Sequence, residues 1–147
     1  MMTYDARDGY VVLFGGVNTG TDPEATWTFV HGTSIHLGSA GGPGFLEGAS
    51  FVGDARAGYA VLFGGPTVWQ SNETGAFSNG TWSAFQPTVS PPPRSFAPMA
   101  YDPHGGYLVR FGGFNDDGDT FFSDTGHVGV RARELEPSCL KLRARMP

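Results

Sequence analysis

YDARDGYVVLFGG, the stretch Tyr4–Gly16, returns twice along the chain, as GDARAGYAVLFGG at Gly53–Gly65 and as YDPHGGYLVRFGG at Tyr101–Gly113. The phenylalanine before the paired glycines is Phe14, Phe63 and Phe111 in turn, so the repeats are 49 and 48 residues apart. A period of this length is typical of proteins whose structural units bury their apolar faces against neighbouring copies. The sequence therefore predicts a repeat fold.

Each copy of the repeat is expected to form a β-hairpin. In the second copy the extended run 49–52 is followed by the polar turn 54–58 and by the apolar strand Tyr59–Phe63. The turn opens with an aspartate, whose carboxylate accepts backbone hydrogen bonds, and closes with a glycine, which tolerates positive φ. These positions are Asp5, Asp54 and Asp102, and Gly9, Gly58 and Gly106. In the first copy we expect Tyr10, Val12 and Phe14 to face one side of the strand and Val11 and Leu13 the other.

A second hairpin follows in the first two units. Residues 26–30 are expected to pair with 34–37, and residues 74–77 with 81–85 through the Asn79-Gly80 turn. Each unit is then a four-stranded antiparallel sheet, and no helix is expected before Val128. Arg110 stands where the other copies carry Leu13 and Leu62, so one face of the last unit is expected to meet water or a differently shaped neighbour.

The double glycines, a tyrosine four residues before the phenylalanine, and a tryptophan in the second hairpin resemble the kelch repeat of galactose-oxidase-like β-propellers. The motif residues are Gly15, Gly16, Gly64, Gly65, Gly112 and Gly113, with Trp27 and Trp82. Pro92-Pro93-Arg94 is similar to the entry of such a repeat. Gly75 and Gly126 depart from the pattern, since each stands where Trp27 would align. The resemblance implies an all-β fold, a partial β-propeller of about three four-stranded antiparallel kelch-type blades whose ring is not closed.

The expected blades cover residues 1–44, 45–93 and 94–125, and residues 126–147 form a degenerate last hairpin or an unstructured basic tail. Propellers typically have four to eight blades, so three do not close a ring. The chain is then a fragment of a longer propeller, a partial arc, or part of a ring built from several copies, as in a homo-oligomer. We favour the fragment, because the chain begins inside a strand and ends in unrelated sequence.

The composition and charge of the chain limit the classes of partner and the location that we expect. The 147 residues carry a formal net charge of −5, which gives no electrostatic footprint for nucleic acid. No apolar run is long enough for a membrane span, and no signal peptide precedes the first repeat. One cysteine, Cys139, excludes an intramolecular disulfide. The lysine-poor composition, rich in glycine, serine, threonine and aromatic residues, favours an extracellular or cell-surface location.

We expect no catalytic, metal or cofactor-binding residue in this chain. His31 and His36 flank one hairpin turn but lack a third ligand. The family includes copper oxidases with a tyrosine–cysteine pair, but Cys139 lies in the unmatched tail. The acidic run 115–119 is interpreted as a solvated loop in preference to a structural turn or a Ca²⁺ site. The remaining acids are scattered over loops.

The expected contact surface is the set of loops after the double glycines, since loops on rigid scaffolds often carry function. Its candidate partner-binding residues are Trp69, Phe114, Asn115, Asp116 and Asp117. The sequence thus favours a non-catalytic binding module that presents loops to a protein or glycan partner. The alternative is a fragment of a carbohydrate-active or oxidase-type propeller enzyme whose catalytic residues lie in missing blades.

Overall fold

The fold is all-β. The computed structural model describes residues 1–16, 24–39, 41–44, 47–65, 74–85, 91–115 and 120–128. Thirteen strands and no helix lie within these ranges, as expected from the sequence. No helix long and apolar enough to cross a membrane occurs in this part of the chain.

The first sheet contains β1 (Met2–Asp5), β2 (Tyr10–Phe14), β3 (Thr26–Val30) and β4 (Thr33–Gly38), which lie side by side in chain order. All neighbouring strands are antiparallel. The two hairpins expected from the repeat are therefore joined into one four-stranded sheet.

The second sheet repeats this arrangement. Strands β5 (Ser50–Asp54), β6 (Tyr59–Phe63), β7 (Thr74–Ser78) and β8 (Thr81–Phe85) pair in the same order and with the same antiparallel sense. Asn79 and Gly80 both have positive φ at the tip of the β7–β8 hairpin, which is the geometry that such a tight turn requires.

The third sheet has three strands in the described residues. β10 (Tyr107–Phe111) lies between β9 (Met99–Asp102) and β13 (Thr125–Val128). β11 (Phe114–Asn115) and β12 (Thr120–Phe121) form a separate short hairpin. β13 crosses the blade boundary expected at residue 125, and residues 129–147 lie outside the described part of the chain.

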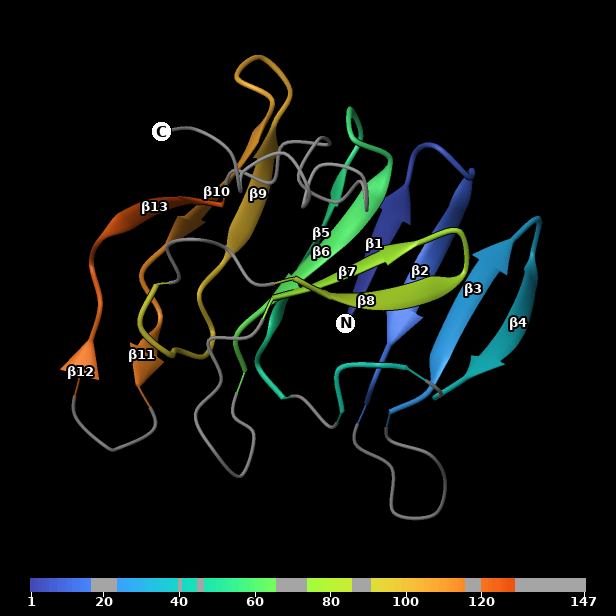
Figure 1. Cartoon of the computed structure of the whole chain (residues 1–147), viewed down its shortest axis with the longest axis horizontal. Helices are drawn as coiled ribbons and strands as arrows, with labels where there is room; N and C mark the ends of the chain where they lie inside the picture. The colour runs from blue at the N-terminus through green and yellow to red at the C-terminus, as the bar shows by residue number, and fades with distance from the viewer. Residues whose placement is uncertain are drawn as a thin grey trace, which may run out of the picture.

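The three sheets follow one another across the molecule in a propeller-like arrangement that does not close (Figure 1). The first strand of each sheet lies beside that of the next, β1 beside β5 and β5 beside β9, whereas β4 lies at the outer edge of the first sheet. The β11–β12 hairpin lies at the lower end of the view, opposite the turns that join the first two strands of each sheet (Figure 1).

Those turns have the expected structure. Asp5 Oδ1 accepts hydrogen bonds from the backbone N–H groups of Arg7 and Asp8 at 3.0 and 3.2 Å. Equivalent bonds join Asp54 to Arg56 and Ala57, and Asp102 to His104. The closing glycines, Gly9, Gly58 and Gly106, have φ of 75°, 73° and 70°. One aspartate and one glycine thus fix each turn, which explains why both recur in all three copies.

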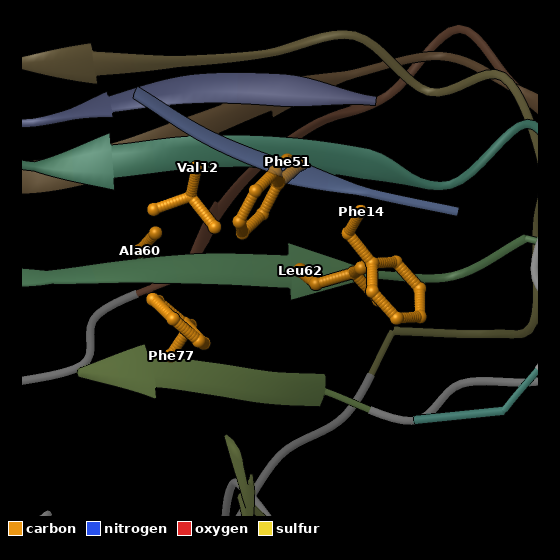
Figure 2. Close-up of a cluster of buried hydrophobic side chains, with 6 residues drawn as sticks. All are labelled: Val12, Phe14, Phe51, Ala60, Leu62 and Phe77. Atoms are coloured by element: carbon orange, nitrogen blue, oxygen red, sulfur yellow. The ribbon is translucent and has the colours of Figure 1, made fainter. Parts of the chain in front are cut away.

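The core between the first and second sheets is built from both of them. Val12 and Phe14 come from β2, and Phe51, Ala60, Leu62 and Phe77 come from the second sheet (Figure 2). Trp82 packs against this cluster, with ring centroids 4.9 Å from Phe14, 5.6 Å from Phe51 and 5.2 Å from Phe77. Its indole Nε1–H donates a 2.8 Å hydrogen bond to Thr26 Oγ1 across the junction.

The core between the second and third sheets uses the other face of β6. Tyr59 and Val61 pack with Leu108 of β10, and Met99 and Tyr101 of β9 lie against them. Every residue of β6 is buried. This strand is therefore covered on both faces, because alternate residues enter the two junctions.

Candidate functional site

The loops expected to bind a partner are described only in part. Trp69, Asp116 and Asp117 lie outside the described residues. Phe114 and Asn115 form β11, directly after the third double glycine. The site is therefore built from the β11–β12 hairpin and the segments beside it.

Three phenylalanines form an aromatic platform at this end of the third sheet. The rings of Phe96 and Phe114 are stacked, with centroids 5.3 Å apart and planes only 6° from parallel. The ring of Phe121, on β12, has its centroid 6.1 Å from that of Phe114. Phe96 is 55% exposed and Phe121 is 82% exposed. We call Phe96, Phe114 and Phe121 the aromatic platform.

Backbone hydrogen bonds hold Phe114 in place. Its N–H donates to the carbonyl oxygen of Ser95 at 3.0 Å, and the Ser95 N–H donates back to the Phe114 carbonyl at 2.8 Å. This bridge ties the chain that enters the third sheet to the chain that leaves β10. The platform is thus fixed at its centre to a buried segment, since Ser95 is itself buried.

Phe96 has an unusual backbone conformation. Its φ of 54° lies in the left-handed region, which costs a bulky residue about 1–3 kcal/mol unless the surrounding structure enforces it. Here its N–H donates a 2.7 Å hydrogen bond to the Gly48 carbonyl. Its ring lies directly on Gly48, where a Cβ would come within 2.6 Å of the ring. The glycine and the strained turn together place this ring against Phe114.

An ion cluster lies beside the platform. Arg94 Nη1 is 2.6 Å from Asp124 Oδ1, and Arg110 Nη2 is 3.1 Å from Asp124 Oδ2. The two arginine side chains are buried, whereas the Asp124 side chain is 50% exposed. The hydrogen bonds from Arg94 and then Arg110 lower the pKa of Asp124 to about 2. The carboxylate is therefore ionised at neutral pH and bridges two buried cations.

Arg94 also joins this cluster to the third double glycine. Its Nη1 donates to the Gly112 carbonyl at 3.0 Å, and its guanidinium carbon lies 3.8 Å from the centre of the Phe122 ring. Arg94 comes directly after Pro92-Pro93, so the expected entry motif supplies a buried structural arginine.

Arg110 is buried too, so of the two environments expected for this position, water is the wrong one. The side chain faces the second sheet, with its guanidinium carbon 5.9 Å from the centre of the Phe63 ring, and does not face water. Gly126 makes this possible, because a Cβ there would collide with the guanidinium. The differently shaped neighbour is therefore the correct alternative.

The double glycines all lie just past the second strand of their sheets. Every member, from Gly15 and Gly16 to Gly112 and Gly113, has positive φ. In the second pair, Gly65 donates its N–H to the Arg94 carbonyl at 3.2 Å, and a Cβ on Gly64 would collide with the same oxygen. The pair thus lets the chain leading to the third sheet approach the end of β6.

The two motif tryptophans differ in environment. Trp82 fills the junction between the first and second sheets, as described above. Trp27 lies on the opposite face of the first sheet, where its ring centroid is 4.4 Å from that of His36, and it is exposed.

No group of three or more His, Cys, Asp or Glu side chains that could hold a metal ion occurs among the described residues.

Sequence reasoning did not find Phe96, Phe121, Arg94 or Asp124 as parts of one site. Phe121 lies in the same loop as the predicted Phe114, so the only available signal was its proximity in sequence.

Searches with protein-family models and against curated proteins found no match to the chain.

Proposed function

We propose that this chain is a kelch-type propeller piece that acts as a non-catalytic binding module, and that the aromatic platform contacts its partner. The observation that carries the proposal is the exposure of Phe121, whose ring stands beside two stacked rings and is almost uncovered. Aromatic residues, phenylalanine included, are enriched in protein interfaces, and an exposed apolar patch marks an interaction site.

The chemistry of the platform favours a protein over a glycan. Phenylalanine has no polar tip, whereas glycan sites combine an aromatic face with hydrogen-bond donors and acceptors. Asp124, in the ion cluster beside the platform, already has its two oxygens bound to Arg94 and Arg110. An apolar side chain of a protein partner, packed on the exposed ring of Phe121, fits these features best.

The proposal is tested with peptides that bind the wild-type chain and with a glycan array. Peptides from a displayed random library are isolated against the wild type, and their Kd is then measured for Phe121→Ser and for the control Ile35→Ser. Ile35 is also exposed but lies on β4 of the first sheet. Loss of an anchor side chain is expected to weaken binding at least tenfold, while the control leaves it unchanged.

Peptides that bind Phe121→Ser as well as they bind the wild type would contradict the proposal. Binding on a glycan array that is lost in Phe121→Ser, with no platform-dependent peptide, would assign the same surface to a sugar instead.

A further inference from the structure

The first sheet has an uncovered apolar face. Register pairs Met2 with Leu13, Tyr4 with Val11, Val11 with Phe29, and Leu13 with Trp27, so these six side chains share one side of the sheet. Val12 and Phe14 point to the other side, into the junction with the second sheet. Met2, Tyr4, Trp27 and Phe29 are all exposed, Tyr4 by 58%. We call these six residues the head face.

The equivalent face is covered in the other two sheets. In the second sheet the aligned residues include Phe51, Leu62 and Phe77, which are buried against the first sheet. In the third sheet the aligned residues Met99, Tyr101 and Leu108 pack against the second. A preceding sheet thus covers this face wherever one is present. An open apolar face of this kind marks an interaction site.

The head face carries its own version of the junction tryptophan. In the second sheet Trp82 of β8 lies over Gly75 of β7, where a Cβ would be 3.5 Å from the indole. In the first sheet the position of Gly75 is occupied by Trp27, and the position of Trp82 by Ser34. The tryptophan is on the third strand of the first sheet but on the fourth strand of the second, and a small residue takes the other position in each. An indole therefore covers a similar part of both sheets.

The third sheet has the complementary uncovered face at the other end of the arc. Tyr107, Val109 and Phe111 align with Tyr10, Val12 and Phe14, the residues that the first sheet turns toward the second. Phe111 is 54% exposed, whereas Phe14 is fully buried. Thr125, opposite Phe111, aligns with Thr26, which accepts the Trp82 hydrogen bond, and is exposed. We call Tyr107, Val109, Phe111 and Thr125 the tail face.

The turns show the same complementarity. The Arg7 side chain lies over Gly58 of the next sheet, and the Arg56 side chain lies over Gly106 of the one after it. His104 holds this position in the third turn and is exposed. No described atom lies within 4 Å of the place where a Cβ on Gly9 would be. At the tail end, His104 is thus the exposed counterpart of Arg7 and Arg56. At the head end, Gly9 is the uncovered counterpart of Gly58 and Gly106.

The sequence favoured a fragment of a longer propeller over a ring built from several copies. From the two complementary faces we propose instead that the occupant of the head face is the tail face of a second copy of this chain. Each copy offers both surfaces, and both are versions of surfaces that already pack together twice within the chain. Two copies joined head to tail give six sheets, within the four to eight typical of closed propellers, whereas three copies give nine. The inference goes beyond the binding function and does not depend on the aromatic platform.

The test is the mass of the full chain in solution, measured by light scattering at about 10 and 100 µM. The expected mass is twice the 15.6 kDa of one chain. Tyr4→Glu in the head face and Phe111→Glu in the tail face are each expected to halve it, because a carboxylate would be buried in the junction. Ile35→Glu changes another exposed side chain, on the opposite face of the first sheet, and is expected to leave the mass unchanged.

Mixing the two disruptive variants tests the head-to-tail arrangement. Tyr4→Glu keeps an intact tail face and Phe111→Glu keeps an intact head face, so the mixture restores one of the two junctions. Its mass is expected to exceed that of either variant alone. Circular dichroism of each variant checks that the strands are retained.

Three results would overturn the proposal. A wild-type mass of one chain at both concentrations would show that a second copy does not cover these faces. A dimer that persists in both glutamate variants would have another interface. Assemblies larger than two copies would show that the head-to-tail contact does not close a ring of six sheets.

Discussion

The three repeat phenylalanines allow one test of the stacked sheets within a single motif. Phe14, Phe63 and Phe111 hold the same place in the sequence, but Phe14 and Phe63 are buried between sheets and Phe111 is 54% exposed. The sequence motif alone assigns the three residues equal importance. The structure assigns large effects to two of them and a small one to the third.

Replacement of each by alanine is expected to separate them. A buried Phe→Ala change costs about 3–5 kcal/mol. We expect about 4 kcal/mol for Phe14, whose ring is fully buried and makes an edge contact of about 0.5–1.5 kcal/mol with Trp82. At Phe111 about half of the side chain is already in water, and we expect about 1 kcal/mol or less. The difference between the two positions is then about 3 kcal/mol.

The assay is urea unfolding followed by tryptophan fluorescence, carried out in the Tyr4→Glu background so that self-association does not contribute. If Phe14→Ala is too unstable to purify, Phe14→Leu is used in its place. It is expected to lower the free energy of unfolding by less than Phe14→Ala, but by more than the same change at Phe111. Equal losses of stability at positions 14 and 111, or a loss below about 1 kcal/mol for Phe14→Ala, would refute the assignment of Phe14 to an inter-sheet core.

Three further changes test other contacts. Trp82→Phe removes the hydrogen bond to Thr26 and is expected to cost about 1 kcal/mol; in a double-mutant cycle with Thr26→Val, additive losses would contradict that bond. Asp124→Asn leaves two buried arginines without their carboxylate and is expected to cost about 1–2 kcal/mol at pH 7, because the carboxylate itself is half exposed. Because the pKa of Asp124 is lowered to about 2 in the folded chain, its contribution is present above pH 4 and is lost as the pH falls from about 4 to 2. The variant should therefore lose less stability than the wild type over that range, and parallel losses would count against the ion cluster. Gly53→Ala places a methyl group against a backbone oxygen of β1 and should lower Tm by several degrees, whereas Gly75→Ala, whose Cβ has room, should not.

The repeat made the sheets predictable because it fixes both strand and turn. Period-two alternation in Tyr59–Phe63 indicates which residues enter which junction, and both junction cores follow it. The Asp and Gly of each turn could be interpreted from backbone chemistry alone. These are local features, so a single sequence contains them.

The aromatic platform could not be predicted in the same way. Its central contact joins Gly48, Phe96 and Phe114, which are distant in sequence and meet only when the second and third sheets are in place. The burial of Arg110 likewise depends on Gly126, a residue that by sequence spacing only marks a missing tryptophan. Such pairings are set by how the sheets stack, and the repeat pattern does not specify them.

The contact between Trp82 and Thr26 tests the stacking of the sheets most directly, because it links β8 of the second sheet to β3 of the first. In a nuclear Overhauser spectrum of the folded chain, the indole N–H proton of Trp82 should show cross-peaks to the Thr26 methyl group, and the indole ring protons should show cross-peaks to the ring of Phe14. A well-dispersed β-sheet spectrum in which Trp82 contacts only residues of its own sheet would contradict the account.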